Sequence, residues 1–337
     1  MKEKFSQLKS FISRHYVIRR LLQMIPILFG ITILTFFIMK IAPGSPLQTM
    51  INPRLSMDDI KAAEDALGLN DPIWMQYFKW LIQIFQGNLG YSVKSGRAVT
   101  ALFAERIGPT LLLTLTAYFI SLIFGVILGV FSATHRNSIG DYILTVLAFI
   151  GVAVPGFFLA LGAVYVFSLK LGWFPTGAMK TIGADLTGFA GFLDVVKHLV
   201  LPATVMALPE TARITRYARS SMLDVINEDY IRTARAKGLS EKRVIYIHAF
   251  RNALIPIITL FGLSLPSLLG GSYIVESLFN WPGLGTLGIK AITDREYSVL
   301  MALNLITAVL VLLGNFIADL LYTVADPRIR VAKEKDD

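Results

Sequence analysis

The stretch LLQMIPILFGITILTFFIM, residues 21–39, contains no charged side chain. As an α-helix it would be about 28 Å long, close to the roughly 30 Å thickness of a bilayer's hydrocarbon core. The basic residues before it resemble the start of a secretory signal, but the apolar stretch is longer than in a signal peptide and no small-x-small cleavage site follows. The stretch therefore predicts a membrane-spanning helix that remains in the protein.

The composition of the whole chain agrees with this prediction. Apolar residues make up 54% of the sequence and charged residues only 16%, against about 25% in an ordinary soluble domain. The net charge of +9 is spread between long apolar runs, which is not the pattern of a nucleic-acid-binding protein. The chain has no cysteine, so disulfides, thiolate metal sites and cysteine nucleophiles are excluded.

Five further apolar runs follow, at residues 111–131, 142–169, 199–217, 253–275 and 299–324. We therefore expect an all-α integral membrane protein with six transmembrane helices. Several of these runs are interrupted by proline or glycine, and interrupted helices often line a transport pathway, although close helix packing through small residues is an equal alternative. The interruptions are Pro155, Gly156, Pro202, Pro209, Pro256, Pro266, Gly270 and Gly271.

The distribution of Lys and Arg predicts the orientation, because cationic loops stay on the cytoplasmic side. With the amino terminus inside, most of the 32 Lys and Arg residues fall on the inner side. We therefore expect cytoplasmic tails at residues 1–20 and 327–337, an outer segment at residues 40–106, and a cytoplasmic loop at residues 218–251.

The outer segment has the pattern of a small helical subdomain. Ser56 and Asp71 are candidate helix caps, and Pro72 after Asp71 is a first-turn proline that indicates the start of a second helix, which ends near Gly87. We expect this second helix to be a docking platform for an outside partner; the alternative is an amphipathic helix lying on the bilayer surface. One face of this helix carries Ile73, Tyr77, Trp80 and Ile84.

The cytoplasmic loop contains the most basic segment, YIRTARAKGLSEKRVIYIHAFRNALIP, residues 230–256. A short helix is expected to end at Gly238, because glycine adopts the left-handed conformation without cost. Ser240 can cap a second helix with Glu241 in its first turn, so the segment predicts a helical hairpin. The alternative is that its cations only fix the topology and contact anionic lipid.

The spacing around Gly238 resembles the cytoplasmic loop of ABC importer permeases, in which E-A-A, three residues, Gly, nine residues and I-x-L-P follow one another. Here Arg232-Thr233-Ala234 replaces E-A-A, and residues 248–251 replace the last element. Both departures resemble the oligopeptide and dipeptide branch of that family. Further stretches look like its B-type subunit: APGSP (42–46), GNLGYS (87–92), ERIGPTLLLTL (105–115), ESLFNWPGLG (276–285) and DLLYTVADPRIR (319–330).

The resemblance implies a type I importer in the plasma membrane of a prokaryote, in which residues 107–326 form the permease core. It implies that a second homologous permease completes the pathway, that two cytoplasmic ATPases use ATP and Mg²⁺, and that an extracellular binding protein delivers a peptide. The chain has no G-x-x-x-x-G-K-[ST] phosphate loop, so ATP must be hydrolysed by another chain. Membrane lipid is a further partner, and nucleic acid is not expected.

The resemblance also assigns roles to residues. The ATPase-coupling loop is expected to comprise Arg232, Thr233, Ala234, Arg235, Ala236, Lys237, Gly238, Leu239 and Glu241. Contact with the extracellular partner is expected at Pro43, Gly44 and Pro46, and the pathway wall at Ser264, Ser267 and Gly271.

Other patterns point to no chemistry of their own. The fingerprint at Gly283, Gly285 and Gly288 lacks a preceding strand, so we expect a tight turn with an interfacial Trp281 and no nucleotide site. The four histidines, expected on loops and in contact with solvent or the membrane interface, lack metal-ligand spacing. Glu210 is expected to pair with a cation such as Arg213. No catalytic motif is present, so a membrane enzyme or an assembly factor is a remote alternative; a nickel or metal-chelate permease is a nearer one.

Overall fold

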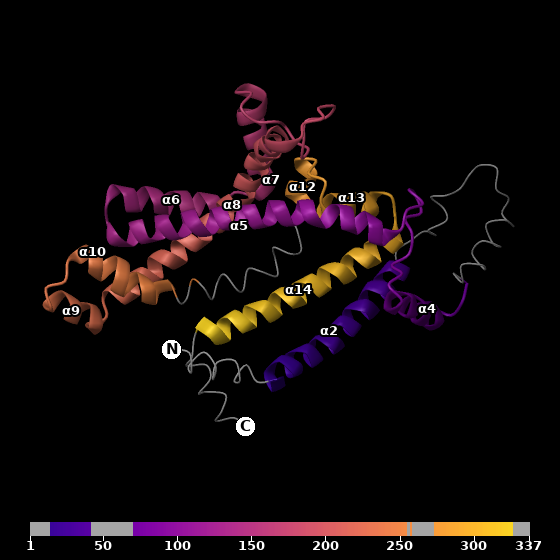
Figure 1. Cartoon of the computed structure of the whole chain (residues 1–337), viewed down its shortest axis with the longest axis horizontal. Coiled ribbons are helices and arrows are strands. Elements are labelled where there is room, and N and C mark those ends of the chain that lie inside the picture. Colours follow the sequence, from indigo (N-terminus) through magenta and orange to yellow (C-terminus); the bar gives the residue numbers. More distant parts are fainter. Residues whose placement is uncertain (1–13, 42–69, 255–256, 258–272, 326–337) are drawn as a thin grey trace. The chain divides into compact units, whose positions relative to one another are not determined.

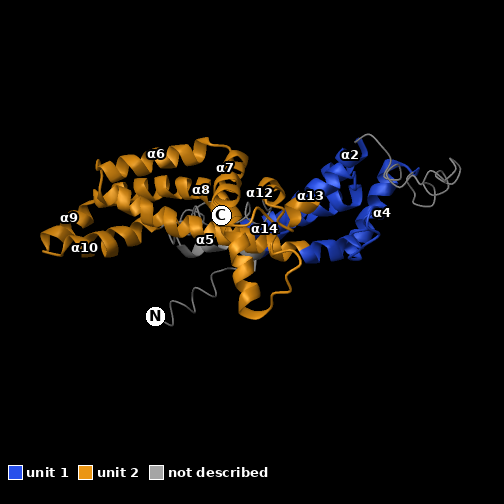
Figure 2. Ribbon diagram, turned by 90° about the horizontal axis from the view of Figure 1, so that it is seen from above, with its two compact units in different colours: residues 1–105, 288–316 blue, residues 106–287, 317–337 orange. Residues whose placement is uncertain are grey.

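The computed structural model describes residues 14–41, 70–254, 257 and 273–325. These residues are mostly helical, and the sole β-type pairing among them is an isolated bridge between Tyr91 and Ala98. The chain divides into two compact units (Figure 2), residues 1–105 with 288–316 and residues 106–287 with 317–337. Figure 1 labels the helices α2 (Arg14–Ile41), α4 (Ile73–Phe85), α5 (Val99–Thr134), α6 (Ile139–Ala153), α7 (Gly156–Ala163), η2 (Val164–Lys170), α8 (Gly188–Ile226), α9 (Asp229–Ala236), α10 (Glu241–Arg243), η3 (Val244–Ala249), α12 (Tyr273–Leu278), α13 (Leu284–Thr293) and α14 (Tyr297–Ala325).

Four of these helices are long and apolar enough to cross a membrane: Ile18–Ile41, Val99–Thr134, Gly188–Ile226 and Tyr297–Asp319. They correspond to the predicted first, second, fourth and sixth spans. A fifth candidate is a helix pair, Ile139–Ala153 and Gly156–Lys170. Most of the predicted span at residues 253–275 lies outside the described residues, so the all-α membrane fold is confirmed while the count of six spans stays a prediction.

The predicted third span, residues 142–169, is broken at Pro155 and Gly156, the interruption that the sequence indicated. Its two halves meet at an angle of 104°. The bend follows from Pro155, because proline disfavours the α conformation in the residue before it and Val154 is accordingly extended (φ −79°, ψ 124°). The second half then begins at Gly156 and ends as a π-helix, η2.

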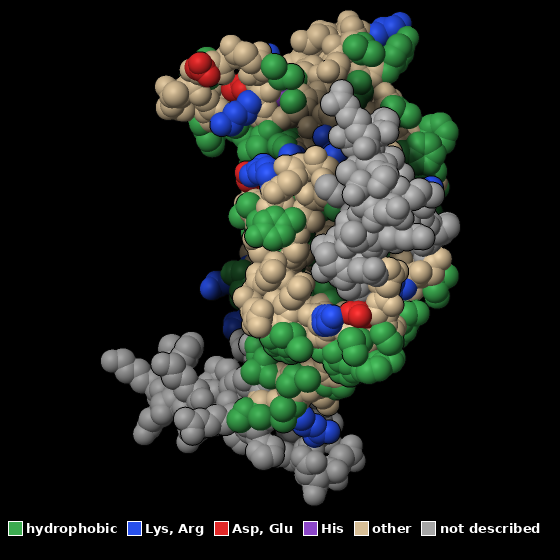
Figure 3. Space-filling view, turned by 90° about the vertical axis from the view of Figure 1, so that its right-hand side faces the viewer, with side chains coloured by type: hydrophobic (Ala, Val, Ile, Leu, Met, Phe, Trp, Pro, Cys, Tyr) green, Lys and Arg blue, Asp and Glu red, His purple; other side chains and the backbone are tan. Residues whose placement is uncertain are grey.

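Large apolar side chains cover much of the surface of the described helices, and Figure 3 shows few charged side chains among them on that face. Ile25 in α2, Phe124 in α5 and Phe149 in α6 are each more than half exposed. A soluble monomer rarely exposes apolar side chains in such continuous numbers. This surface suits contact with lipid or with other membrane subunits.

Glycines bring α5, α6 and α8 close together within the second unit (Figure 1). A Cβ added to Gly125 would lie 2.7 Å from the Ile214 side chain, and one added to Gly129 would lie 2.5 Å from the Ala218 Cβ. Gly151 of α6 faces Ala212 of α8 in the same way, at 3.1 Å. Small residues therefore let these backbones approach, as expected for helices that pack within a membrane.

The start of α13 is held by a buried carboxylate, that of Glu276. Its Oε2 accepts a hydrogen bond from the Gly285 backbone N–H at 2.7 Å, and its Oε1 accepts one from the Thr110 hydroxyl at 2.8 Å. Side chains at Gly283 and Gly285 would collide with Glu276, so both glycines are required by this close approach. The apparent dinucleotide fingerprint is therefore a helix start built around an internal anion.

Two sequence-based predictions are corrected in this unit. Trp281 is not interfacial: it is fully buried, and its indole N–H donates to the Pro109 carbonyl at 2.8 Å. His198 is not on a loop: it is buried within α8, which begins at Gly188 rather than near residue 199, and its Nδ1 lies 2.8 Å from the Asp194 carbonyl oxygen. His15 and His248 were also expected on loops, but they lie in α2 and η3. The predicted pairing of Glu210 with Arg213 is confirmed, with Arg213 Nε donating to Glu210 Oε2 at 2.9 Å.

In the first unit, α4 packs against α2 through aromatic side chains. The predicted face of α4 is confirmed at Tyr77, which is buried and lies 5.4 Å from the Phe36 ring between centroids, whereas Ile73 at the start of that face is 48% exposed. The predicted cap at Asp71 is wrong: Pro72 occupies the N-cap position, and the Asp71 carboxylate instead pairs with Lys79 Nζ at 2.5 Å. The predicted cap at Ser56 lies outside the described residues.

Candidate functional site

The basic segment forms a helical hairpin at one end of the α5, α6 and α8 group (Figure 1). Its first helix, α9, is anchored by Ile231 and Ala234, which are buried on one side of the helix. They pack into a cluster with residues of α5, α8 and η3, so the hairpin is fixed to the long helices by apolar contacts on one face. The cluster consists of Val130, Ala133, Met222, Ile231, Ala234, Val244, Ala249 and Ala253.

The turn between the two arms is built at Gly238, as predicted. Gly238 has φ +77°, the left-handed conformation that glycine adopts without cost. The Gly238 N–H donates to the Arg235 carbonyl at 2.9 Å, and the Leu239 N–H donates to the Ala234 carbonyl at 3.4 Å. This pair of bonds is the Schellman motif, which satisfies the last carbonyls of α9. Leu239 also packs on the anchoring cluster.

A salt bridge joins the two arms across the glycine. Arg235 on α9 donates from both Nε and NH2 to the Glu241 carboxylate, at 3.1 Å and 2.7 Å. The hydrogen bond and charge of Arg235 hold the pKa of Glu241 below its usual range, and the same pairing raises the pKa of Arg235. Ser240 occupies the predicted N-cap position of α10, but its side chain makes no capping bond, so that part of the prediction is wrong.

The opposite face of the hairpin is exposed and cationic. Arg232, Ala236 and Lys237 all face away from the anchoring cluster. Arg232 is 73% exposed and its ion pair with Asp229 spans 3.3 Å, a weak surface contact that leaves the guanidinium free to find a stronger partner. Small side chains at Thr233 and Ala236 leave the backbone of α9 open to close approach. The face is therefore suited to insertion into a groove on another protein.

Two hydrogen bonds close the base of the hairpin. The Ser221 hydroxyl of α8 donates to the Ala253 carbonyl at 3.0 Å, and the Asn252 amide donates to the Tyr230 hydroxyl at 3.1 Å. Both join the chain entering the hairpin to the chain leaving it. A displacement of the hairpin would therefore be transmitted to α8 and to the segment after η3.

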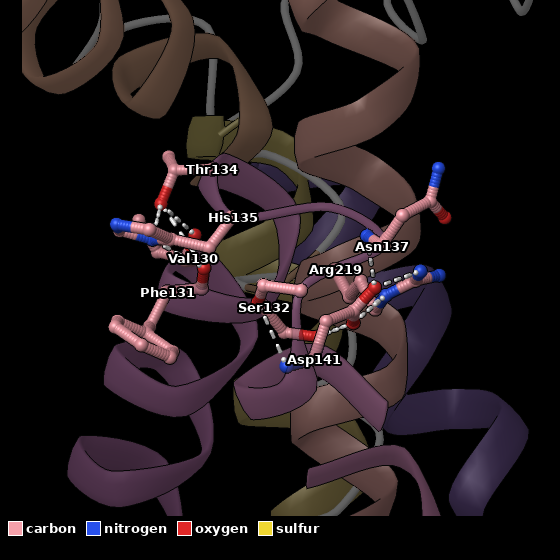
Figure 4. A network of polar contacts seen from close by, with 9 residues as sticks. Val130, Phe131, Ser132, Thr134, His135, Asn137, Asp141 and Arg219 are labelled. Carbon is pink, nitrogen blue, oxygen red and sulfur yellow. Dashed lines mark hydrogen bonds and ion pairs between the residues drawn. The ribbon is translucent and has the colours of Figure 1, made fainter. Parts of the chain in front are cut away.

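An ion pair that was not predicted joins α6 to α8 (Figure 4). The Asp141 carboxylate at the start of α6 accepts two hydrogen bonds from Arg219 of α8, at 2.8 Å and 2.9 Å. It also accepts bonds from the Ser132 hydroxyl at the end of α5 and from the Asn137 backbone N–H. The network thus ties together the helices on which the hairpin is anchored.

A local signal for part of this network was present in the sequence. Ser138 and Asp141 have the spacing of a capping box, and the Ser138 hydroxyl accepts the Asp141 N–H at 3.2 Å. Asp141 departs from the standard box because its carboxylate bonds to Asn137 rather than to the cap residue itself. Its long-range partner Arg219 could not be read from this spacing.

Pro43, Gly44 and Pro46 lie outside the described residues, as do Ser264, Ser267 and Gly271. Within the described part of the chain, no group of three or more His, Cys, Asp or Glu residues could hold a metal ion.

Comparison with protein families gives two matches. Residues 125–331 match the family described as the inner membrane component of binding-protein-dependent transport systems. Residues 13–114 match the family described as the amino-terminal part of that membrane component. The first match contains the hairpin, all of α8 and the carboxyl-terminal end of α5.

Several transport system permease proteins are similar to this chain. The chain is 49% identical to the oligopeptide transport system permease protein AppB of Bacillus subtilis over 315 residues, covering 93% of this chain and 98% of AppB. It is 40% identical to the di/tripeptide transport system permease protein DppB of Pseudomonas aeruginosa, covering 94% and 98%. It is also 38% identical to the glutathione transport system permease protein GsiC of Escherichia coli, covering 94% and 99%.

A solved structure supports the fold alone. A chain of the MetNI methionine ABC transporter in an inward-facing conformation aligns with a TM-score of 0.54 at 17% identity. The alignment covers 67% of this chain and 97% of that chain. The two chains therefore share a fold over that part of the sequence.

Proposed function

Because the chain belongs to the family of binding-protein-dependent transport system inner membrane components, we propose that it is a permease subunit of an ATP-driven peptide importer. It is a transport component of the membrane and not an enzyme. The resemblance seen in the sequence motifs is thereby confirmed. Peptides are the proposed cargo because relatives of nearly equal length are named for oligopeptides, di/tripeptides and glutathione.

The observation that carries the proposal is the hairpin around Gly238. One face is fixed to α5, α8 and η3 by buried Ile231 and Ala234, while the other is exposed and cationic. A rigid element with one anchored and one open face can convey the motion of a partner into the long helices. The proposed partner for the open face is an ATPase subunit.

In the proposed assembly, the chain pairs with a second homologous permease and with two ATPase subunits that bind ATP and Mg²⁺. Closure of the ATPases on ATP shifts the permeases between two states, and the hairpin carries that shift. A binding protein on the outer side delivers the peptide, with contact at Pro43, Gly44 and Pro46. Ser264, Ser267 and Gly271 are proposed for the pathway wall.

The same proposal includes the orientation, with both termini and the hairpin in the cytoplasm of a prokaryotic cell. Cationic loops are retained on that side, and the segment from Arg213 to Arg251 is rich in Lys and Arg. An ATPase is cytoplasmic, so the coupling face must be on the cytoplasmic side.

Uptake in cells tests the proposal. Cells lacking the gene and cells with the gene restored are compared for uptake of a labelled short peptide and of labelled nickel with and without a chelator. Restoration of peptide uptake alone is the expected result. Restoration of nickel uptake alone would overturn the peptide cargo while leaving the transporter architecture intact, and unchanged uptake of both would overturn the proposed cargo altogether.

A further inference from the structure

Helix α4 has three distinct faces around its axis. Successive residues of an α-helix are turned by about 100°, which places Tyr77, Trp80 and Ile84 together on the face that packs on α2. Gln76, Lys79 and Gln83 form a polar face. A third face is apolar but exposed, and we call it the α4 stripe: Trp74, Phe78, Ile82 and Phe85.

The exposure of the α4 stripe is large. Trp74, Phe78 and Ile82 are each more than half exposed, and Phe85 is 83% exposed. Half of the circumference of α4 is apolar, and the polar face lies on the opposite side of the helix. Helix α2 covers only part of the apolar half. The α4 stripe is the uncovered part of the apolar half, so it lies directly beside the face that contacts α2.

Contacts with α2 place α4 beside the apolar part of that spanning helix. The Thr32 hydroxyl donates to the Phe29 carbonyl at 2.7 Å, so its one proton is used. The Tyr77 hydroxyl therefore donates to Thr32 Oγ1, at 2.9 Å. The Tyr77 ring also lies 6.2 Å from the Phe29 ring and 6.5 Å from the Phe37 ring, between centroids.

This placement sets the depth of α4. Thr32 precedes Lys40, the first cation after the apolar stretch of α2, by about 12 Å along the helix. A tyrosine side chain is shorter than this distance. The backbone of α4 at Tyr77 therefore lies deeper in the hydrocarbon region than Lys40. In that position the α4 stripe lies beside exposed apolar side chains of α2, those of Phe29 and Phe37, whose rings contact Tyr77.

From this geometry we infer that α4 is embedded in the leaflet that surrounds the carboxyl-terminal half of α2, with the α4 stripe in contact with lipid acyl chains. The polar face, with Lys79 paired to Asp71, points to the headgroups and water. An apolar face opposite a polar one is the arrangement of an interfacial membrane helix. The α4 stripe is therefore a lipid-binding surface and not a docking platform for a protein.

Spin labelling of the assembled transporter in phosphatidylcholine and phosphatidylglycerol nanodiscs tests this inference. The chain has no cysteine, so single cysteines can be introduced into a complex whose partner subunits are also cysteine-free. Labels at Phe78→Cys and Ile82→Cys are compared with matched labels at Lys79→Cys and Gln83→Cys. Collision rates are measured with oxygen, which concentrates in acyl chains, and with a water-soluble nickel chelate.

We expect the ratio of oxygen to nickel-chelate collisions to be several-fold higher at the two stripe positions than at the two polar positions. Equal ratios would show that the α4 stripe faces water, which would leave it available to a soluble partner. Low collision rates with both reagents would show a protein interface. Either result would overturn the inference.

A second measurement uses a native side chain and needs no label. Trp74 is 59% exposed. Trp173 is 58% exposed and remains as a second exposed tryptophan when Trp74 is replaced. Lipids brominated near the top of the acyl chain should quench Trp74, and the quenched fraction of the total fluorescence should fall in Trp74→Phe. An unchanged quenched fraction in that variant would contradict contact between the α4 stripe and lipid.

Discussion

The Arg219 guanidinium meets the Asp141 carboxylate in a two-point ion pair that joins α8 to the first turn of α6. The two bonds, Nε to Oδ1 at 2.8 Å and NH2 to Oδ2 at 2.9 Å, connect residues 78 positions apart. The Asp141 side chain is only 3% exposed, whereas that of Arg219 is 31% exposed. Removal of Arg219 and removal of Asp141 should therefore lower the free energy of unfolding by different amounts.

Removal of the cation should be the more damaging change. Arg219→Ala leaves a buried carboxylate without its counter-charge, which costs about 3 kcal/mol. Asp141→Asn leaves a half-buried guanidinium that can still reach water, and we expect about 1 to 2 kcal/mol. Thermal unfolding of the purified transporter measures both. Arg216→Ala on the same helix is the comparison, because Arg216 is exposed and its contact with α6 is with the Phe149 ring, 5.9 Å from the ring centroid. A larger loss for Asp141→Asn would contradict this ranking.

Strain at Gly238 should uncouple transport without removing the protein from the membrane. An alanine at φ +77° costs about 1 to 2 kcal/mol in backbone strain, although no atom lies within 4 Å of its Cβ. Bulky residues should be worse and should abolish peptide uptake. Gly183→Ala is the matched control, since Gly183 has φ +81° and equally open surroundings. Uptake should fall only for the Gly238 variants; an equal loss in both would argue against a special role for the hairpin.

Replacement by alanine should change the free energy of unfolding differently at two helical glycines. At Gly129 a Cβ would lie 2.5 Å from the Ala218 Cβ and 2.7 Å from the Thr215 carbonyl, so Gly129→Ala should separate α5 from α8 and cost about 1 to 3 kcal/mol. At Gly162 in α7 nothing lies within 4 Å, and Gly162→Ala should be neutral or stabilising by up to about 1 kcal/mol. Unfolding midpoints of the two variants test the contrast, which would fail if both shifted in the same direction.

Acid should loosen the hairpin through Glu241. Arg235 lowers the pKa of Glu241 in the folded hairpin, so the pair contributes stability above the unfolded-state pKa and loses it as pH falls through the folded-state pKa. The side chains of Arg235 and Glu241 are 39% and 55% exposed, and solvent screening limits the effect to about a few tenths of a kcal/mol.

Hydrogen exchange of the amides of Gly238 and Leu239 measures this effect. Exchange corrected for the intrinsic effect of pH should be faster near pH 3 than at pH 7 in the wild type. Glu241→Gln should show the faster exchange at both values. Protection that is independent of pH in the wild type would rule out a contribution from this pair.

The apolar runs and the short motifs were sufficient for the fold class, the family and the hairpin. Each depends on residues close together in the chain: the length of an uncharged stretch for a span, and the glycine at Gly238 for the turn. The salt bridge between Arg235 and Glu241 was not predicted, but it lies within the same local segment. Ser240 shows the limit of such reasoning, because a side chain in a capping position need not form the bond.

The sequence by itself determined where the chain is apolar, where it turns and which segment carries the exposed cations, because these properties depend on neighbours within one or two helical turns. Only the tertiary structure decided the pairing of Asp141 with Arg219, the burial of Trp281 and His198, and the enclosure of Glu276 by Thr110 and Gly285. Those features join distant segments or depend on where a long helix begins. In a chain rich in interchangeable apolar residues, local spacing does not specify which helices meet; close approach at Gly125, Gly129 and Gly151 does.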